Sequence, residues 1–304
     1  MFDFASESAL FIGSRIGFST VRRCGRGLGT LLWHILPDRR KLAVESIQKR
    51  LGAGRRQAEA IARESFKSNC QSFAEILLNP RLKDSLPPLT DIDDAEQLAR
   101  VLALPRPIVG ITAHLGAWEM LTGCLSQHAH CGKEQLVVTR RQKNMFFQKA
   151  IVALRSANNL RIVDHRNAAR PVLKALKNNA IACFLADHNC SEAEALFLPF
   201  LGKTAAVNRG PAILAVRAKA LVLPAFMIRA PNGRFRFHHL PPLDTTELEG
   251  TADERVEAVT RYYNSAIESM VKKYPEQWFW MHKRWKTQPS GSRRVQTEKN
   301  QGTE

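Results

Sequence analysis

Two residues of this chain, His114 and Glu119, have the types and the spacing that general acid–base chemistry needs. They stand five positions apart in the stretch ITAHLGAWEM, residues 111–120, whose other side chains are mostly apolar. Inside one helix, that separation would turn the two side chains about 140° apart, so they could not touch. We therefore expect a strand to end at His114, a tight turn at Gly116 and a helix after it, which would bring Glu119 back to the ring.

In that arrangement the Glu119 carboxylate would accept a hydrogen bond from one ring nitrogen and leave the other free to take a proton from an alcohol. No nucleophilic serine or cysteine is then needed, because the alcohol of a substrate can itself attack an activated acyl group. The alternative is a buried structural pair, which is the more common meaning of a lone histidine with an acid at this spacing. The rest of the sequence must decide between the two.

The elements that would position the pair alternate between short apolar strands and helices. Residues 107–112 are predicted to form a buried strand, and residues 117–125 the start of a helix. Further strands are predicted at residues 136–139, 181–187 and 220–228, and a last helix at residues 253–273, preceded by a capping box of Thr251 and Glu254. The alternation predicts an α/β fold with a mixed, mostly parallel central sheet flanked by helices, in which reacting groups gather where strands end.

The composition is that of a folded protein with an anionic partner. Of the 304 residues 44% are hydrophobic, and 45 Lys and Arg against 28 Asp and Glu give a net charge of +17. Such a charge favours nucleic acid, an acidic lipid surface or an acidic protein as partner. Nucleic acid comes second, because no zinc finger, basic zipper or RNA-recognition pattern occurs. Six cysteines without CxxC spacing indicate a reducing, cytosolic setting.

The first forty residues mix arginine with large apolar side chains. On a helical wheel Leu10, Phe18, Val21 and Leu28 fall on one arc, while Arg15, Arg22 and Arg26 fall on another. No stretch approaches the length of apolar sequence that a spanning helix needs. We therefore divide the chain into an interfacial, membrane-associating amphipathic helix at residues 1–40, a main domain at residues 41–289 and a disordered polar tail at residues 290–304.

One group of residues has side chains that zinc prefers. Cys124, His128, His130 and Cys131 lie together in GCLSQHAHCG. A second ligand pair at a fixed spacing is missing, so we favour a helix that ends in a polar loop and expect no metal site.

The passage TAHLGAWE resembles the His-x4-acid motif of the lysophospholipid and glycerolipid acyltransferase superfamily, in the glutamate form of the bacterial lipid A biosynthesis (lauroyl and myristoyl) acyltransferases. Further blocks agree in order between about residues 10 and 289. VVTRRQKN, with Arg140 and Asn144, resembles the second block, and LRIVDHRN carries an arginine of the third, Arg166. FLADHN, with Asp187, resembles the turn that ends the next strand, and YPEQWFWMHKRWKTQP resembles the C-terminal signature.

The resemblance implies an O-acyltransferase that moves a fatty acyl chain from an acyl-carrier-protein thioester to a hydroxyl of a lipid A precursor. His114 would be the general base, and Glu119 would orient it. Arg140 would bind a phosphate of the anionic lipid acceptor, and Asn144, Arg166 and Asp187 would shape the substrate site. No cofactor is implied, because the thioester arrives activated. The implied location is the cytoplasmic face of the cell inner membrane, as a peripheral or monotopic protein.

Several alternatives remain open at the level of sequence. The acceptor could be another membrane lipid, such as a glycerolipid, an aminolipid or a phosphoinositide mannoside, and the donor could be a coenzyme A thioester. From a different class, the chain could be a non-catalytic basic protein that binds nucleic acid. The C-terminal tryptophans, Trp278, Trp280 and Trp285, could pack in the core or form an interface belt, and we favour a mixture of the two.

Overall fold

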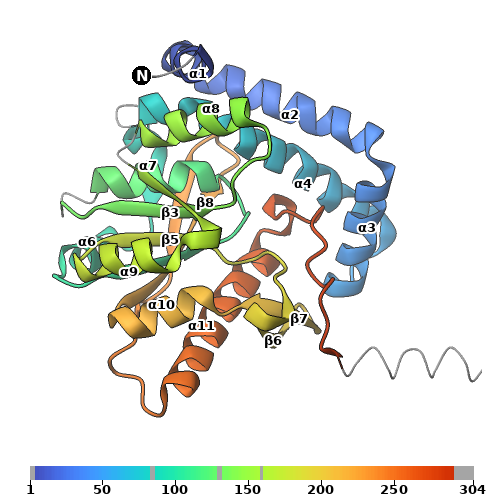
Figure 1. Cartoon of the computed structure of the whole chain (residues 1–304). Helices are drawn as coiled ribbons and strands as arrows, with labels where there is room; N and C mark the ends of the chain where they lie inside the picture. The colour runs from blue at the N-terminus through green and yellow to red at the C-terminus, as the bar shows by residue number, and fades with distance from the viewer. Residues whose placement is uncertain (1–3, 83–85, 129–131, 158–159, 291–304) are drawn as a thin grey trace, which may run out of the picture.

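A computed structural model of the chain describes residues 4–82, 86–128, 132–157 and 160–290. A central sheet carries helices on both faces, and the N-terminal helices lie across one end of it (Figure 1). Within the described part of the chain, every helix is too short or too polar to cross a membrane.

The central sheet is mixed and mostly parallel, which confirms the predicted fold class. Its strands run in the order β1-β9-β8-β2-β5-β3-β4, and β10 pairs with β8. The five strands from β8 to β4 are parallel to one another, whereas β9 and β10 are antiparallel to β8. The bounds are β1 Thr90–Ile92, β2 Ile108–Thr112, β3 Gln135–Thr139, β4 Leu160–Asp164, β5 Ile181–Leu185, β8 Leu221–Arg229, β9 Phe235–His239 and β10 Leu243–Asp244. A separate hairpin consists of β6 Ala195–Phe200 and β7 Lys203–Asn208.

The register between the two central strands decides what can meet at the edge of the sheet. β2 pairs with β5 although β3 and β4 lie between them in the sequence, and Thr112 lies opposite Leu185. The ladder continues for one more hydrogen bond, from the Ala186 amide to the Thr112 carbonyl. Since the strands are parallel, residues two positions after each strand also face each other.

The helices divide between the two faces of the sheet and an N-terminal group. A buried apolar cluster lies on each face of the sheet. On one face α6 and α7 pack with Ile108 of β2, and on the other α9, α10 and α11 pack with Val109 and Ile111. The bounds are α1 Phe4–Arg15, α2 Phe18–Ile35, α3 Pro37–Leu51, α4 Arg55–Glu75, α6 Ala95–Ala103, α7 Trp118–His128, α8 Met145–Ser156, α9 Ala169–Lys177, α10 Gly210–Ala218 and α11 Ala252–Lys273. Short 3-10 helices are η1 Ile76–Arg81, η2 Pro87–Leu89, η3 His165–Asn167, η4 Glu192–Glu194 and η5 Pro275–Gln277.

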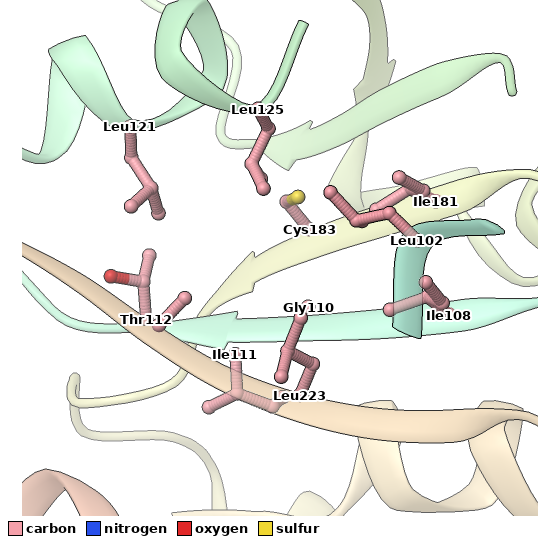
Figure 2. Close-up of a pocket in the computed structure, with 11 residues that line it drawn as sticks. Leu102, Ile108, Gly110, Ile111, Thr112, Leu121, Leu125, Ile181, Cys183 and Leu223 are labelled. Atoms are coloured by element: carbon pink, nitrogen blue, oxygen red, sulfur yellow. The ribbon is translucent and has the colours of Figure 1, made fainter. Parts of the chain in front are cut away.

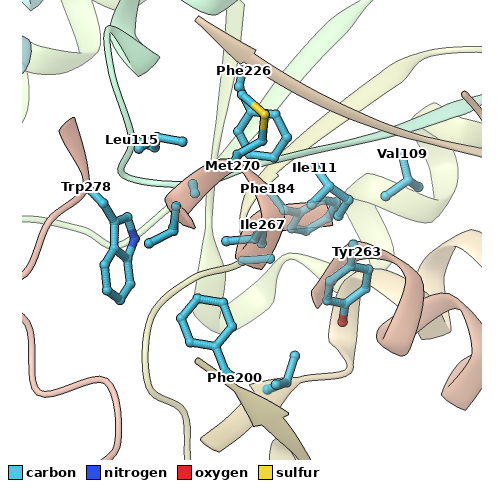
Figure 3. Packing of buried hydrophobic residues seen from close by; sticks show 14 of the residues in the cluster. Val109, Ile111, Leu115, Phe184, Phe200, Phe226, Tyr263, Ile267, Met270 and Trp278 are labelled. Atoms are coloured by element: carbon cyan, nitrogen blue, oxygen red, sulfur yellow. The ribbon is translucent and has the colours of Figure 1, made fainter. Parts of the chain in front are cut away.

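Helix α11 covers one face of the sheet with the spacing that the sequence predicts. Its side chains Tyr263, Ile267 and Met270 are buried in the same apolar cluster as Ile111 and Phe226 of the strands, part of which Figure 3 shows. The capping box is present, because Thr251 accepts from the Glu254 amide and Glu254 accepts from the Thr251 amide. The last helix is therefore fixed both by its cap and by its apolar stripe.

The N-terminal region differs from the single amphipathic helix that the wheel predicts. The chain breaks at Ile16 and Gly17 into α1 and α2, so residues on either side of the break do not share one face. Val21 is 1% exposed in the core, whereas Leu28 is 47% exposed. The apolar arc is thus split between the core and the surface.

Two glycines explain why α2 packs onto the protein. A Cβ at Gly25 would lie 2.5 Å from Gln71 Cα, and one at Gly29 would lie 2.5 Å from Lys67 Cα. The backbones of α2 and α4 are therefore in direct contact, which only glycine permits at these positions. Helix α2, residues 18–35, is therefore packed on the folded domain along one side and exposed on the other.

Candidate active site

His114 lies at the carboxyl edge of the sheet, two residues after β2 ends, and it is held by Asp187, two residues after β5. One oxygen of Asp187 accepts from the His114 backbone amide at 2.9 Å, and the other is 2.8 Å from ring Nδ1. The two contacts fix both the backbone and the ring. With Nδ1 carrying the proton that Asp187 accepts, Nε2 presents a lone pair. Nε2 forms no hydrogen bond with any residue that the structure describes.

Asp187 is itself buried and held by the C-terminal segment. Its side chain is 4% exposed, and the same oxygen that binds the His114 amide also accepts from Trp278 Nε1 at 2.9 Å. Burial alone would raise the pKa of Asp187, but the charge and hydrogen bond of His114 outweigh it, so the pKa lies well below its usual range. The carboxylate is therefore ionised at any physiological pH.

The same pair sets the protonation of His114. Burial lowers its pKa, but the charge and hydrogen bond of Asp187, with a further contribution from Glu119, raise it above the ordinary imidazole value. Two neighbouring histidines behave in the opposite way, since burial lowers the pKa of His188 and brings that of His282 to about 4. His114 is thus a stronger base than either neighbour.

Glu119 does not hold the His114 ring, contrary to the prediction from spacing. The helix does begin directly after the turn, at Trp118, and Glu119 is in its first turn. Its carboxylate instead accepts two hydrogen bonds from Arg155 near the end of α8, at 3.1 and 2.6 Å. This ion pair is nearly buried, with side chains 7% and 19% exposed. Asp187 takes the place that the sequence assigns to Glu119 because the neighbouring strand end is closer to the ring than the helix is.

The turn between His114 and α7 depends on glycine and on a polar network behind it. Gly116 has φ +64°, and a Cβ there would lie 2.1 Å from the Met227 carbonyl oxygen. Ser72 of α4 donates a hydrogen bond to the Gly116 carbonyl, and Ser72 in turn accepts from Arg229, which pairs with the fully buried Glu75. The predicted tight turn is therefore present, and α4 and β8 hold it in place.

The C-terminal segment closes the back of the site. Its backbone runs along the turn, with the Phe279 amide donating to the His114 carbonyl at 3.1 Å and the Gly116 amide donating to the Gln277 carbonyl at 3.1 Å. Trp278 and Trp280 are each 1% exposed. For Trp278 and Trp280 the structure gives core packing, together with the hydrogen bond from Trp278 to Asp187, whereas Trp285 is half-buried.

Aromatic side chains flank the open side of His114. Trp118 and Phe279 lie 5.3 and 6.0 Å from its ring, centroid to centroid. Phe73 packs edge-on against both of them and is 51% exposed. An apolar wall thus leads from the histidine to the surface of α4.

The other predicted site residues lie farther along the same edge of the sheet. Arg140 follows β3, two strands from β2 or about 10 Å, and it is exposed without an ion pair to any described residue. Arg166 follows the outermost strand β4, about 14 Å from β2, and is exposed. Asn144 caps α8, since its Oδ1 accepts from the Phe146 and Phe147 amides. The structure therefore brings together His114, Asp187 and Glu119, and places the two arginines beside them at some distance.

A closed apolar cavity lies between β2 and α7, as Figure 2 shows, but it cannot hold a fatty acyl chain. Its volume is about 10 Å³, and its walls include Gly110, Thr112, Leu121 and Cys183. That is room for about one water-sized sphere. The Thr112 hydroxyl has no hydrogen-bond partner among the described residues.

The zinc-type group is only partly visible. His130 and Cys131 lie outside the described residues. Burial raises the pKa of the Cys124 thiol to about 12, so it stays protonated. Elsewhere, the described chain brings no three metal-binding side chains together.

Three contacts at the site were missed by reasoning from the sequence. Asp187 could have been assigned to His114 from its position directly after an apolar strand, had the strand order been known. Arg155 gave no signal, because an arginine in the last turn of a helix is ordinarily a solvated charge. Trp278 also gave no signal, because nothing in the sequence distinguishes a tryptophan that only packs in the core from one that also donates a hydrogen bond to the site.

The chain is similar in sequence to one family of known proteins. A family model described as bacterial lipid A biosynthesis acyltransferase matches residues 2–287. The lipid A biosynthesis lauroyltransferase of Escherichia coli (strain K12) is 28% identical over 139 residues, 45% of this chain and 44% of that protein. The palmitoleoyltransferase of the same strain is 30% identical over 128 residues, 41% of this chain and 40% of that protein. The aligned part of the chain thus spans less than half of each relative.

Because Asp187 offsets the effect of burial, Asp187→Asn should lower the pKa of His114 from above to below the ordinary imidazole value of about 6.5. The titration is followed by NMR of the His114 ring, assigned with a His114→Gln variant. An unchanged pKa in the asparagine variant would show that Asp187 does not set the charge of the ring.

Glu119→Gln should reduce the free energy of unfolding by about 3–5 kcal/mol, because it leaves Arg155 buried without a carboxylate. The double variant Glu119→Gln/Arg155→Met should recover most of this loss. Glu64→Gln is the matched control, since the Arg26–Glu64 pair is exposed and should contribute less than about 1 kcal/mol. Urea unfolding measures all four proteins; a double variant as unstable as the single one would argue against the pair.

Proposed function

Because the chain belongs to the bacterial lipid A biosynthesis acyltransferase family and is an acyltransferase, we propose that it transfers a fatty acyl chain from an acyl-carrier-protein thioester to a hydroxyl of a lipid A precursor. The observation that carries the chemistry is His114, with Nδ1 bound to a buried, ionised Asp187 and Nε2 free. That is the arrangement of a general base whose tautomer is fixed.

The reaction proceeds in two steps around Nε2. Nε2 takes the proton of the acceptor hydroxyl as its oxygen attacks the thioester carbonyl, and Asp187 stabilises the imidazolium that forms. The tetrahedral intermediate then collapses, the carbon–sulfur bond breaks, and the imidazolium returns the proton to the departing thiolate. Such base assistance contributes about 10²- to 10⁴-fold to the rate. Since the pKa of His114 is raised, the rate should rise with pH through a midpoint above the ordinary imidazole value.

Glu119 has a supporting role in this proposal. Its charge adds to the electrostatic stabilisation of the imidazolium, and its ion pair with Arg155 fixes the first turn of α7 beside the base. The acyl chain lies against the aromatic wall of Trp118, Phe279 and Phe73, since the closed cavity is too small for it.

The acceptor is held by charge at the edge of the sheet. Arg140 is exposed after β3 and provides a planar guanidinium for a phosphate, with Arg166 farther out. The enzyme works at the cytoplasmic face of the inner membrane, attached peripherally. Another membrane lipid remains the alternative acceptor, because the phosphate site and the base would serve any anionic lipid with a hydroxyl.

His114→Ala and Asp187→Asn should each lower turnover about a hundredfold or more without changing the melting temperature by more than a few degrees. The assay follows acylation of a detergent-solubilised lipid A precursor by mass spectrometry, with acyl-carrier-protein and coenzyme A thioesters as donors. His238→Ala is the matched control, since His238 is also paired with an aspartate, Asp93, but lies on β9, away from the residues assigned to the site. Near-normal turnover in the His114 variant would rule out the mechanism, and acylation of a glycerolipid alone would favour the alternative acceptor.

Arg140→Ala should reduce kcat/KM for a phosphorylated acceptor about ten- to a hundredfold, because a charge-assisted contact contributes about 1.5 to 3 kcal/mol. Arg140→Lys should restore only part of the loss, since an ammonium lacks the planar fork. The comparison uses the same acceptor with and without its phosphate. Equal losses on both would assign Arg140 to the donor or to the fold.

A further inference from the structure

Exposed large apolar side chains are concentrated on one part of the molecule. All of those among the described residues, except Leu104, lie on the N-terminal helices, at the start of α8 or beside the site. They are Phe4, Phe11 and Ile12 on α1; Leu28, Leu31, Ile35 and Leu36 at the end of α2; Phe73 on α4; and Met145, Phe146 and Phe147 on α8. The first turn of α8 is notable because it presents three consecutive apolar residues to solvent.

Helices α1 and α8 are neighbours, and each of them carries exposed apolar residues. Figure 1 shows the two helices adjacent to each other at the same end of the molecule. Gly13 of α1 packs against Leu154 of α8 and the Leu77 carbonyl, where a Cβ would lie 2.6 Å from the carbonyl oxygen. Phe4 and Phe11, 78% and 59% exposed, are on the outer side of α1. We call Phe4, Phe11, Ile12, Met145, Phe146 and Phe147 the α1/α8 surface.

The first turn of α8 is fixed in this exposed position. The Asn144 side chain caps the helix through the amides of Phe146 and Phe147. The two phenylalanine rings also pack against each other, with centroids 6.1 Å apart. The exposed rings thus stand on an ordered turn, and the capping hydrogen bonds leave them facing outward.

Cations dominate the charge of the same segments. Residues 8–37 and 135–163 together contain ten Lys and Arg and no Asp or Glu. Helix α1 also carries Glu7 in its first turn, and Arg26, Arg155 and Arg161 are paired with glutamates. Arg140, Arg141 and Lys143 are exposed directly before the α8 turn. Apolar rings bordered by cations match an anionic lipid surface, in which the rings enter the acyl boundary and the cations meet phosphates. A second copy of the chain would instead bring like charges together.

We propose that the α1/α8 surface inserts into an anionic membrane, and that the first turn of α8 is a second membrane contact beyond the N-terminal helices. This inference rests on the membrane attachment in the proposed function. If the second contact is absent, the proposed function still holds. From this turn, α8 runs about 15 Å to Arg155, which binds Glu119 beside His114. The helix thereby connects the lipid surface to the site and sets the orientation in which the base faces the membrane.

The test measures binding of the full chain to vesicles made of equal parts of phosphatidylglycerol and phosphatidylcholine. Phe146→Ser/Phe147→Ser should reduce the partition coefficient about tenfold or more, since two large apolar side chains leave the lipid. Phe4→Ser/Phe11→Ser should give a similar loss. Leu104→Ser is the matched control, because Leu104 is exposed outside the surface and should bind as the unmodified chain does. Melting temperatures should be unchanged in all three.

Turnover separates this inference from the proposed function. In detergent micelles the α8 double variant should acylate normally, whereas on acceptor embedded in vesicles its rate should fall with its binding. Vesicle binding unchanged in the α8 variant overturns the inference and leaves the function intact. Loss of turnover in micelles with a normal melting temperature also overturns it, by assigning these residues to the substrate. Loss of self-association or of carrier-protein binding, with vesicle binding retained, would assign the surface to a protein partner.

Discussion

The contact between Asp187 and His114 is the constraint on which the rest of the site depends. A carboxylate that is 4% exposed remains ionised only where partners offset the cost of burial. Here the partners are the His114 backbone and ring and the Trp278 indole. Three segments far apart in the sequence must therefore be in place at once. The parallel pairing of β2 with β5 brings the first two together, and the C-terminal segment completes the set.

The remaining polar groups serve the geometry around that contact. The network of Ser72, Glu75 and Arg229 holds the Gly116 turn from behind, so His114 is supported by α4 and β8 as well as by its own strand. The Glu119–Arg155 pair ties α7 to α8. Glu119 of the family motif thus affects the His114 ring through its charge and pairs with Arg155, while Asp187, which follows another strand, binds the ring directly.

The α1/α8 surface and the site share elements, as the proposed lipid acceptor would require. Helix α8 has its apolar start on the outside of the molecule and its arginine beside the base, and the aromatic wall runs from His114 to the exposed Phe73. Arg140, Arg141 and Lys143 are exposed between the end of β3 and the start of α8. The proposed attachment to an anionic surface and the proposed recognition of an anionic headgroup would therefore draw on one group of exposed cations.

The sequence by itself determined the local features. The strand before His114, the glycine turn, the capped last helix and the alternation of strands and helices follow from periodicity and backbone preference, which neighbouring residues decide. Tertiary structure alone decided that β5 lies beside β2, that Glu119 pairs with Arg155, that Val21 turns inward and that Trp278 reaches Asp187. These depend on which elements pack together, and a buried charge takes whichever partner the packed chain brings within reach, however distant in sequence.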